Sequence, residues 1–383
     1  MGLRHKIFNA RLLDSGIECS LSNTNYVTSL VASKRNVDDL SSRIRAVIER
    51  AYQHDGGSEL DTLELLHLGK RLAEILIAPS VRDELAKATG TLAIDCDSKL
   101  DHVPWELLVI ENEFVGRRLG VGRITGKMAT VDCQASLPVN ISIVANPQSN
   151  LLGTAREMDK LARLIEKDSR LPQPHVYKHQ VSRDQFCDAL ENASWLHYAG
   201  HMSGAGEAQW ELSDGRLDAA ELVERDKRVP KFVFNNACRS AVVQPHEAGG
   251  KEISIREFLI NNGGEHFLGT IASILDRDSY LFAESFYVEL LAGRTIGTAV
   301  QTARNVLSSQ KRTTTLGWAN YVLYGDPGIA LVPTSVEATA TSFPLNCSRC
   351  DSVIKTRHGI GNGGNEESNV ICRRCATGTR QKA

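Results

Sequence analysis

Trp195-Leu-His-Tyr-Ala-Gly-His201 and Phe232-Val-Phe-Asn-Asn-Ala-Cys-Arg-Ser240 are the two stretches that decide the fold and suggest a chemistry. Each begins with a short apolar run, as expected of a buried strand. His201 follows the first strand, and Cys238 follows the second. Neighbouring strands of a parallel sheet end at the same edge, where open α/β sheets bind their ligands. A thiol and an imidazole at that edge would be placed for nucleophilic catalysis.

From Pro138 onward, strand and helix patterns alternate and are joined by short links. This order indicates right-handed βαβ units and a mostly parallel sheet covered by helices on both faces. Before this region, helices and one strand are predicted. The predicted strands are 90–95, 139–145, 175–178, 194–199, 229–235, 265–271 and 329–332, and the predicted helices are 36–52, 59–77, 80–88, 155–165, 182–191, 218–224, 253–262, 279–291 and 296–309.

The predicted fold class is α/β, and four segments are predicted along a chain long enough for one or two cores. Residues 1–135 are interpreted as a degenerate first α/β lobe, and residues 136–333 as the catalytic domain. Residues 334–345, in a stretch rich in Pro, Ser, Thr and Ala, are interpreted as a linker. Residues 346–383 are predicted to form a small tail.

The composition is that of an ordinary globular protein, with 42% apolar and 23% charged residues among 383. The net charge of −2 argues against a protein that coats nucleic acid or a membrane surface. No apolar run approaches the roughly 18 residues that suggest a membrane span. The basic N-terminus lacks the apolar core of a signal peptide. We therefore expect a cytoplasmic protein whose scattered cysteines are reduced and mostly buried.

Cys238 and His201 could act as nucleophile and base, because cysteine attacks as the thiolate and an imidazole can take its proton. The backbone N–H of a cysteine at a strand end can also stabilise an oxyanion. Ala237 would keep the approach open, and Gly200 would allow the turn that projects the His201 ring. Two alternatives stay open at this point. A cysteine after a strand is often a buried apolar residue, and His197, inside the first strand, competes with His201.

A family resemblance adds to this interpretation. Asn236-Ala-Cys-Arg-Ser240 resembles the Gln-Ala-Cys-Arg-Gly signature of caspases. His197-Tyr-Ala-Gly-His201 resembles the His-Phe-Ala-Gly-His pattern of the CHAT family of caspase-like peptidases. Over residues 90–332, further motifs resemble that family in order and spacing: Asp95, Pro104-Trp-Glu-Leu-Leu108, Ala145-Asn-Pro147, Ala155-Arg-Glu-Met-Asp-Lys-Leu161, Gly264, Leu268-Gly-Thr-Ile271, Asp278, Phe286-Tyr287 and Tyr324-Gly-Asp-Pro327.

The resemblance implies a cysteine endopeptidase with a caspase-type sheet, in which Cys238 is the nucleophile and His201 the base. It also implies an oxyanion hole formed by the backbone N–H of Cys238 and that of the residue after the histidine. This residue is usually Gly in the family and is Met202 here.

The substrate pocket is less well defined. Relatives that cut after Arg or Lys often carry an Asp two residues before the nucleophile, where this chain has Asn236. Asp214, Asp276 and Asp278 could still bind a basic substrate side chain. The alternatives are that these carboxylates are solvated loop charges and helix caps, and that the substrate residue is neutral or small.

Two C-x₂-C pairs, Cys347-Ser-Arg-Cys350 and Cys372-Arg-Arg-Cys375, are separated by 21 residues near the end of the chain. This spacing is typical of a Cys₄ zinc ribbon, although a redox dithiol is an alternative. Four cysteine ligands leave no open position, so Zn²⁺ is predicted to be structural and to supply the folding energy of the tail. The glycine-rich stretch 359–364 is predicted to turn a hairpin. The tail is basic, and we interpret it as a docking surface for a substrate or an activator.

The function predicted from the sequence is a caspase-like endopeptidase with a zinc-ribbon tail. The resemblance suggests a role in bacterial antiviral defence or signalling, with activation by a partner protein or by proteolysis. Residues 244–251 are the predicted switch, because they are Gly-rich and follow the nucleophile. One alternative is a catalytically silent adaptor that binds partners through its sheet edge and zinc ribbon. Another is a nucleic-acid-responsive regulator, but nucleic acid and membrane are not expected as partners.

Overall fold

The computed structural model describes residues 6–22, 31–124, 139–203, 209–224, 228–242, 254–309, 315–332, 343–346 and 353–357. By internal contacts the chain divides into two units, Met1–Val332 and Pro333–Ala383. The predicted boundary at 135/136 and the predicted switch at 244–251 lie outside the described residues.

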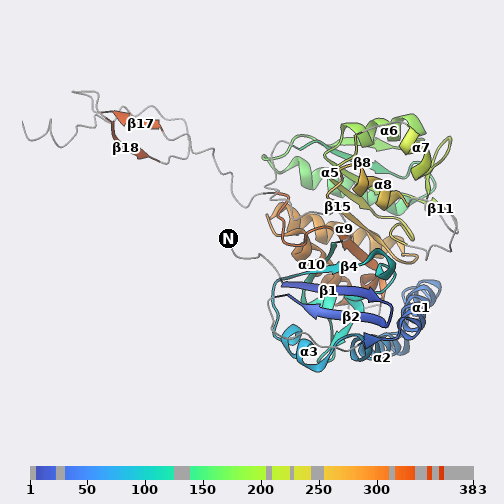
Figure 1. Cartoon of the computed structure of the whole chain (residues 1–383). Coiled ribbons are helices and arrows are strands. Elements are labelled where there is room, and N and C mark those ends of the chain that lie inside the picture. Colours follow the sequence, from blue (N-terminus) through green and yellow to red (C-terminus); the bar gives the residue numbers. More distant parts are fainter. Residues whose placement is uncertain are drawn as a thin grey trace, which may run out of the picture. The chain divides into compact units, whose positions relative to one another are not determined.

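The first unit is built on an 11-stranded sheet with the order β3-β2-β1-β4-β7-β16-β15-β14-β10-β8-β9 (Figure 1). Its strands are β1 (Lys6–Leu13), β2 (Gly16–Leu21), β3 (Val31–Ala32), β4 (Thr91–Cys96), β7 (Gly120–Ile124), β8 (Ile141–Ala145), β9 (His175–Lys178), β10 (Trp195–Ala199), β14 (Phe232–Asn235), β15 (His266–Thr270) and β16 (Tyr321–Tyr324).

The sheet has two halves that meet at one antiparallel pair. In the half β15-β14-β10-β8-β9, all neighbouring strands are parallel. In the other half, β16, β7, β4 and β1 are parallel, and β2 and β3 follow as an antiparallel edge. β15 and β16 run antiparallel and join the two halves into one sheet. The sheet is therefore mostly parallel, as predicted.

Helices cover both faces of the half that carries the predicted site. Apolar side chains alternate along its strands: Trp195 and Ala199 lie in one core cluster with α5, α9 and α10, whereas Leu196 and Tyr198 lie in a second cluster with α6, α7 and α8. This alternation is the two-residue period of a strand buried on both faces. The helices are α5 (Leu152–Glu166), α6 (Arg183–Asn192), α7 (Ala219–Glu224), α8 (Ile255–Asn261), α9 (Asp276–Leu291) and α10 (Ile296–Ser308).

The other half is covered in part by helices α1, α2 and α3, which follow β3 in the chain (Figure 1). Ser58 caps α2 with a capping box, and Pro79 opens α3 at a position where its missing N–H costs nothing. The remaining elements are α1 (Lys34–Gln53), α2 (Glu59–Leu76), α3 (Pro79–Ala86), α4 (Val115–Arg118), the hairpin β5 (Val109–Ile110) with β6 (Glu113–Phe114), the small sheet β11 (Met202–Ser203), β12 (Gln209–Leu212) and β13 (Gly215–Leu217), and short 3₁₀ turns at Ser98–Leu100, Trp105–Leu107 and Gly317–Asn320.

Most of the predicted elements are present, but the end of the sheet was assigned wrongly. Residues 329–332 form no strand, because the turn at 325–328 brings the Ile329 carbonyl to the N–H of Ile296 at the start of α10. The last strand of the sheet is instead β16, for which no strand was predicted. The strands β1, β2 and β7 were also missed. Among the described residues no helix has the length and apolar character needed to cross a membrane.

Candidate active site

The strand ends place the segments that carry His201 and Cys238 side by side at one edge of the sheet. β10 and β14 are parallel neighbours with Tyr198 opposite Asn235. The backbone continues this pairing past the strands, since the N–H of Asn236 donates to the Tyr198 carbonyl at 2.8 Å. His201 and Cys238 therefore follow the carboxyl ends of adjacent parallel strands, the position at which open α/β sheets carry their sites.

The backbone of His201 is held firmly, whereas its ring is partly exposed. The His201 carbonyl accepts hydrogen bonds from the Tyr198 hydroxyl at 2.8 Å and from the Glu211 N–H at 3.1 Å. Gly200 is required here by close approach and not by a turn with positive φ: a Cβ at this position would lie 2.6 Å from the Tyr198 hydroxyl. The ring of His201 has no hydrogen-bond partner among the described residues and is available to act on a ligand.

The thiol of Cys238 is mostly buried and is engaged by the backbone of Ile274. The Ile274 N–H donates to Sγ at 3.4 Å, and Sγ lies 3.8 Å from the Ile274 carbonyl oxygen. Burial raises the pKa of Cys238, and the nearby charges of Glu49 and Asp276 raise it further. In the part of the chain that the structure describes, no hydrogen bond joins the His201 ring to Sγ. The site is therefore in a geometry in which the thiol is protonated at neutral pH.

The loop around Cys238 is fixed to strand β15. Ser240 Oγ donates to the Asn235 carbonyl at 2.7 Å and accepts from the Thr270 N–H at 2.9 Å. Ala237 is buried in the core and its carbonyl accepts from the Thr270 hydroxyl at 2.6 Å, so its methyl group does not border an open approach as expected. Arg239, directly after the cysteine, adopts a left-handed conformation with φ 56°. Such backbone strain costs about 1–3 kcal/mol and is common at functional sites.

His197 belongs to a buried polar network under the sheet. Its Nε2 lies 2.8 Å from Glu157 Oε1, on α5, and its Nδ1 lies 3.4 Å from the Tyr287 hydroxyl. The same Glu157 oxygen accepts from Asn236 Nδ2 at 2.6 Å, and Tyr321 donates to Asn236 Oδ1 at 2.8 Å. His197 and Asn236 are both nearly inaccessible to solvent, so this network lies in the core next to the residues that lead to His201 and Cys238. Asn236, which was predicted as a substrate-pocket residue, is a member of the network.

Glu157 was not among the predicted site residues, although the sequence contains a signal for it. Thr154, Met158, Leu161 and Ile165 form the buried stripe of α5, and Glu157 falls on that stripe with only 1% of its surface exposed. A carboxylate on the apolar face of a helix indicates a buried partner, which here is His197. Glu157 Oε2 has no hydrogen-bond partner among the described residues.

Tyr321→Phe is expected to lower the free energy of unfolding by about 1–3 kcal/mol, because it leaves the buried side-chain oxygen Oδ1 of Asn236 without its donor. Chemical denaturation measures the change. Tyr177→Phe on β9 is the matched control, since that hydroxyl has no hydrogen-bond partner in the described ranges, and its effect should stay within about 0.5 kcal/mol. Equal effects of the two substitutions would contradict a stabilising network.

Met202 packs against the neighbouring strand end. Its Sδ accepts a hydrogen bond from Asn235 Nδ2 at 3.1 Å, and its backbone pairs with Trp210 of β12. The side chain is therefore accommodated at a position where Gly is usual in the family that the motifs resemble.

The three predicted pocket carboxylates lie in different surroundings. Asp214 is exposed and accepts from the Arg183 N–H at the start of α6 at 2.8 Å, which is a capping contact. Asp278 is buried in the first turn of α9, where its carboxylate accepts from Thr315 and faces Gly317. Asp276 is the one whose charge acts on Cys238. The contact of Asp214 fits the capping alternative, and Asp276 follows Ile274, the hydrogen-bond partner of the thiol, by two residues.

The predicted zinc ligands Cys347, Cys350, Cys372 and Cys375 lie outside the described residues, as does the predicted 359–364 hairpin. The second unit has one described hairpin, β17 (Phe343–Asn346) with antiparallel β18 (Val353–Arg357). The first C-x₂-C pair falls within the sequence that connects these two strands. Among residues whose side chains are described, no group of three His, Cys, Asp or Glu is arranged to hold a metal ion.

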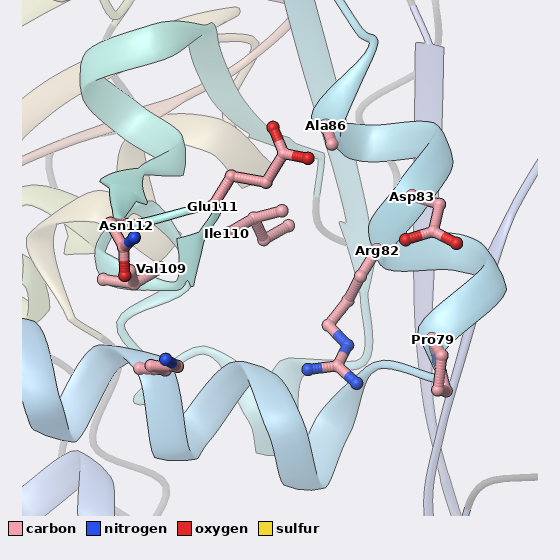
Figure 2. A pocket seen from close by; sticks show the side chains of 9 residues that line it. Pro79, Arg82, Asp83, Ala86, Val109, Ile110, Glu111 and Asn112 are labelled. Atoms are coloured by element: carbon pink, nitrogen blue, oxygen red, sulfur yellow. The ribbon is translucent and has the colours of Figure 1, made fainter.

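A separate hollow of about 240 Å³ opens between α2, α3 and the β5–β6 hairpin (Figure 2). Its walls carry charged side chains of both signs, from Lys70, Arg82, Asp83 and Glu111. Figure 2 shows the Arg82 guanidinium extending between the two helices. None of the predicted site residues lines it. This hollow is therefore separate from the predicted site at His201 and Cys238.

Comparisons with known proteins agree with this architecture. The sequence model described as "CHAT domain" matches residues 66–326. Gingipain R of Porphyromonas gingivalis, an Arg-specific cysteine proteinase, has a similar structure, with a TM-score of 0.51 and 13% identity over 82% of this chain and 81% of that chain. A chain of the Saccharomyces cerevisiae separase–securin complex aligns with a TM-score of 0.46 and 20% identity. The alignment covers 61% of the present chain but only 15% of the chain in that complex. No curated protein sequence matches. The likeness to gingipain R shows a caspase-like α/β fold.

Proposed function

The chain belongs to the CHAT domain family of caspase-like peptidases, and from this premise we propose that it is a cysteine endopeptidase with Cys238 as nucleophile and His201 as general base. The observation that carries the proposal is the delivery of both residues by adjacent parallel strand ends. His197, the competing histidine, is engaged by Glu157 within the core and is the weaker candidate.

The proposed reaction has two stages. His201 takes the Cys238 proton, the thiolate attacks the scissile carbonyl, and a tetrahedral oxyanion forms. The backbone N–H groups of Cys238 and Met202 stabilise this oxyanion, and the Cys238 N–H makes no backbone hydrogen bond among the described residues. His201 then protonates the leaving amine, and a water molecule, activated by the same imidazole, releases the acyl group from sulfur.

The physiological role is proposed from the family resemblance alone. We place the enzyme in a bacterial antiviral defence or signalling system, acting in the cytoplasm on a protein substrate after a partner protein or a proteolytic cut activates it. Asp276 is the best candidate to contact a basic substrate side chain, because its charge acts on the thiol.

Mass spectrometry of a peptide library tests the proposal. With an activating partner present or after the activating cut, the full chain is expected to generate new peptide termini, and cleavage should fall in proportion to the alkylation of Cys238 by iodoacetamide. Cleavage that continues after complete alkylation of Cys238 would contradict the assignment of the nucleophile.

A second candidate function is a catalytically silent adaptor. The observation in its favour is that Sγ contacts Ile274 and makes no hydrogen bond to the His201 ring in the described part of the chain. No cleavage by the intact chain under any activating condition, combined with capture of the same partner proteins by wild type and Cys238→Ala, would favour the adaptor.

For the tail, we propose a structural Zn²⁺ ion held by the two C-x₂-C pairs. The C-x₂-C spacing of both pairs supports this, and the first pair falls in the sequence that connects β17 and β18. Zn²⁺ here would fix the tail and take no part in the reaction, and the basic tail would dock a substrate or an activator.

Cys347→Ser is expected to abolish zinc binding, measured as zinc per chain by elemental analysis, because three thiolates bind Zn²⁺ far more weakly than four. Ser348→Ala, one residue along, is the matched control and should retain the metal. Because the tail forms a separate unit, thermal unfolding of the Met1–Val332 unit should be unchanged by the loss. A wild-type chain that binds no zinc under reducing conditions would contradict the prediction of a zinc ribbon.

A further inference from the structure

The end of α1 contacts both loops that surround Cys238, although this helix precedes the region matched by the CHAT model. Glu49 Oε1 accepts from Arg239 Nη2 at 2.6 Å and from Ser273 Oγ at 2.7 Å. Its Oε2 accepts from the Ser273 N–H at 3.0 Å. Arg239 directly follows Cys238, and Ser273 directly precedes Ile274. The Glu49 carboxylate on α1 therefore contacts both Arg239, which follows Cys238, and Ser273, which precedes Ile274.

The loop that carries Ile274 is held from two sides. On the core side, Asn320 Nδ2 donates to the Ser273 carbonyl at 2.7 Å, and Asn320 Oδ1 accepts from the Ala272 N–H at 2.7 Å. On the other side, Glu49 is the residue that holds Ser273. Asn320 is fully buried, whereas about a quarter of the Glu49 side chain is exposed. The Glu49 contact is therefore the more exposed of the two.

The charges around the thiol favour its neutral form. Glu49 and Tyr52 face it from α1, Asp276 faces it from α9, and Arg239 faces it from its own loop. Arg239 is the group in this set that favours the thiolate, and its guanidinium is paired with Glu49. Burial alone would raise the pKa of Glu49, but the hydrogen bonds from Ser273 and Arg239 outweigh burial and lower it, so Glu49 is ionised at neutral pH.

We propose that Glu49 is a positioning residue that restrains Cys238 in a resting geometry by holding Ser273 and Arg239 together. Release of the Glu49 carboxylate loosens the hold on the Ile274 loop and frees Arg239, so that the thiol can turn toward His201. The proposal deepens the proposed function, on which it rests, by naming the contact through which an activating partner would act. Arg277, which donates to Asp55 just beyond α1, belongs to the same contact between α1 and the start of α9.

The rate of alkylation of Cys238 by iodoacetamide, followed against pH on the full chain by mass spectrometry of its own peptide, tests the restraint. Glu49→Gln removes one negative charge beside the thiol and weakens the hold on Ser273. The midpoint of the alkylation profile is expected to fall by about 0.5 to 1 pH unit, and the rate at about pH 7.5 to rise by about three- to tenfold. Glu64→Gln is the matched control, because it breaks a helix-surface pair with Arg50 that does not reach the site.

Thermal unfolding separates restraint from loosening. Because burial also raises the pKa of Cys238, a variant that merely loosens the fold lowers the midpoint together with the unfolding temperature. That result would overturn the proposal, as would a profile equal to that of wild type. Thermal unfolding confirms that Glu49→Gln is folded, and Glu49→Ala provides a second test of the same midpoint. Alkylation needs no peptidase activity, so a chain that cleaves nothing can still show the shift. Conversely, if the wild-type chain cleaves peptides but Glu49→Gln leaves the midpoint of the alkylation profile unchanged, the restraint is refuted and the proposed peptidase activity is not.

Discussion

Cys238→Ala is expected to lower kcat/KM for peptide cleavage by about 10⁴-fold or more, because removal of the nucleophile leaves only the contribution of substrate binding and oxyanion stabilisation. The substitution removes one sulfur atom from a mostly buried position. The loop keeps its contacts from Ser240 and Thr270 to the strand ends. Substrate binding should therefore change little. The loss is expected in kcat, measured by continuous cleavage of a peptide identified from the library.

Cys19→Ala provides the matched control for the nucleophile. Cys19 is a buried cysteine on β2, in the other half of the sheet, and its pKa is raised by burial to about 12, so it carries no thiolate near neutral pH. Its replacement should leave kcat/KM within about twofold. His201→Ala should lose activity to a similar degree as Cys238→Ala, and the double variant should lose little more, because the two residues act as one unit. Additive losses, or full activity in Cys238→Ala, would contradict the dyad.

The site-bearing half of the sheet was predictable because its signals are local. The strands Trp195–Ala199 and Phe232–Asn235, within the predicted ranges 194–199 and 229–235, are buried along their whole length, and each is too short and too uniformly buried for an amphipathic surface helix. Ser182 opens α6 as predicted, with a capping box to Gln185. The strand-to-loop positions of His201 and Cys238 follow from these strands and from chain order.

The missed features depend on contacts that are distant in the chain. β16 has only four residues, and it is a strand because β15 and β7 flank it. A short apolar run of this kind has no periodicity to distinguish it. Glu49 shows no local sign of its role, since its partners Arg239 and Ser273 lie about 190 and 224 residues further along the chain. Tertiary contacts of this length can be read only from the folded structure.

Glu106→Gln is expected to lower the free energy of unfolding by about 3–5 kcal/mol at neutral pH, because it leaves the buried charge of Arg123 without its partner. Arg123 Nε and Nη2 donate to the two Glu106 oxygens at 2.9 and 2.5 Å, and the two side chains are 1% and 3% exposed. Arg123 also pairs through β7 with Tyr324 of β16, so the ion pair lies near the junction of the sheet halves. Chemical denaturation with tryptophan fluorescence measures the loss.

The pH dependence and two further variants show whether the pair itself is responsible. Burial alone would raise the pKa of Glu106, but Arg123 outweighs burial and lowers it, so the pair stabilises the fold above the unfolded-state pKa of about 4.3 and loses this effect as pH falls through the folded-state value. The difference between wild type and Glu106→Gln should therefore shrink in acid. Glu84→Gln, which breaks an exposed pair with Lys87, should cost less than about 1 kcal/mol. Replacing both partners, as Glu106→Leu with Arg123→Met, should recover most of the loss, because an apolar pair leaves no buried charge. A Glu106→Gln cost no larger than that of Glu84→Gln would show that this buried ion pair does not stabilise the fold.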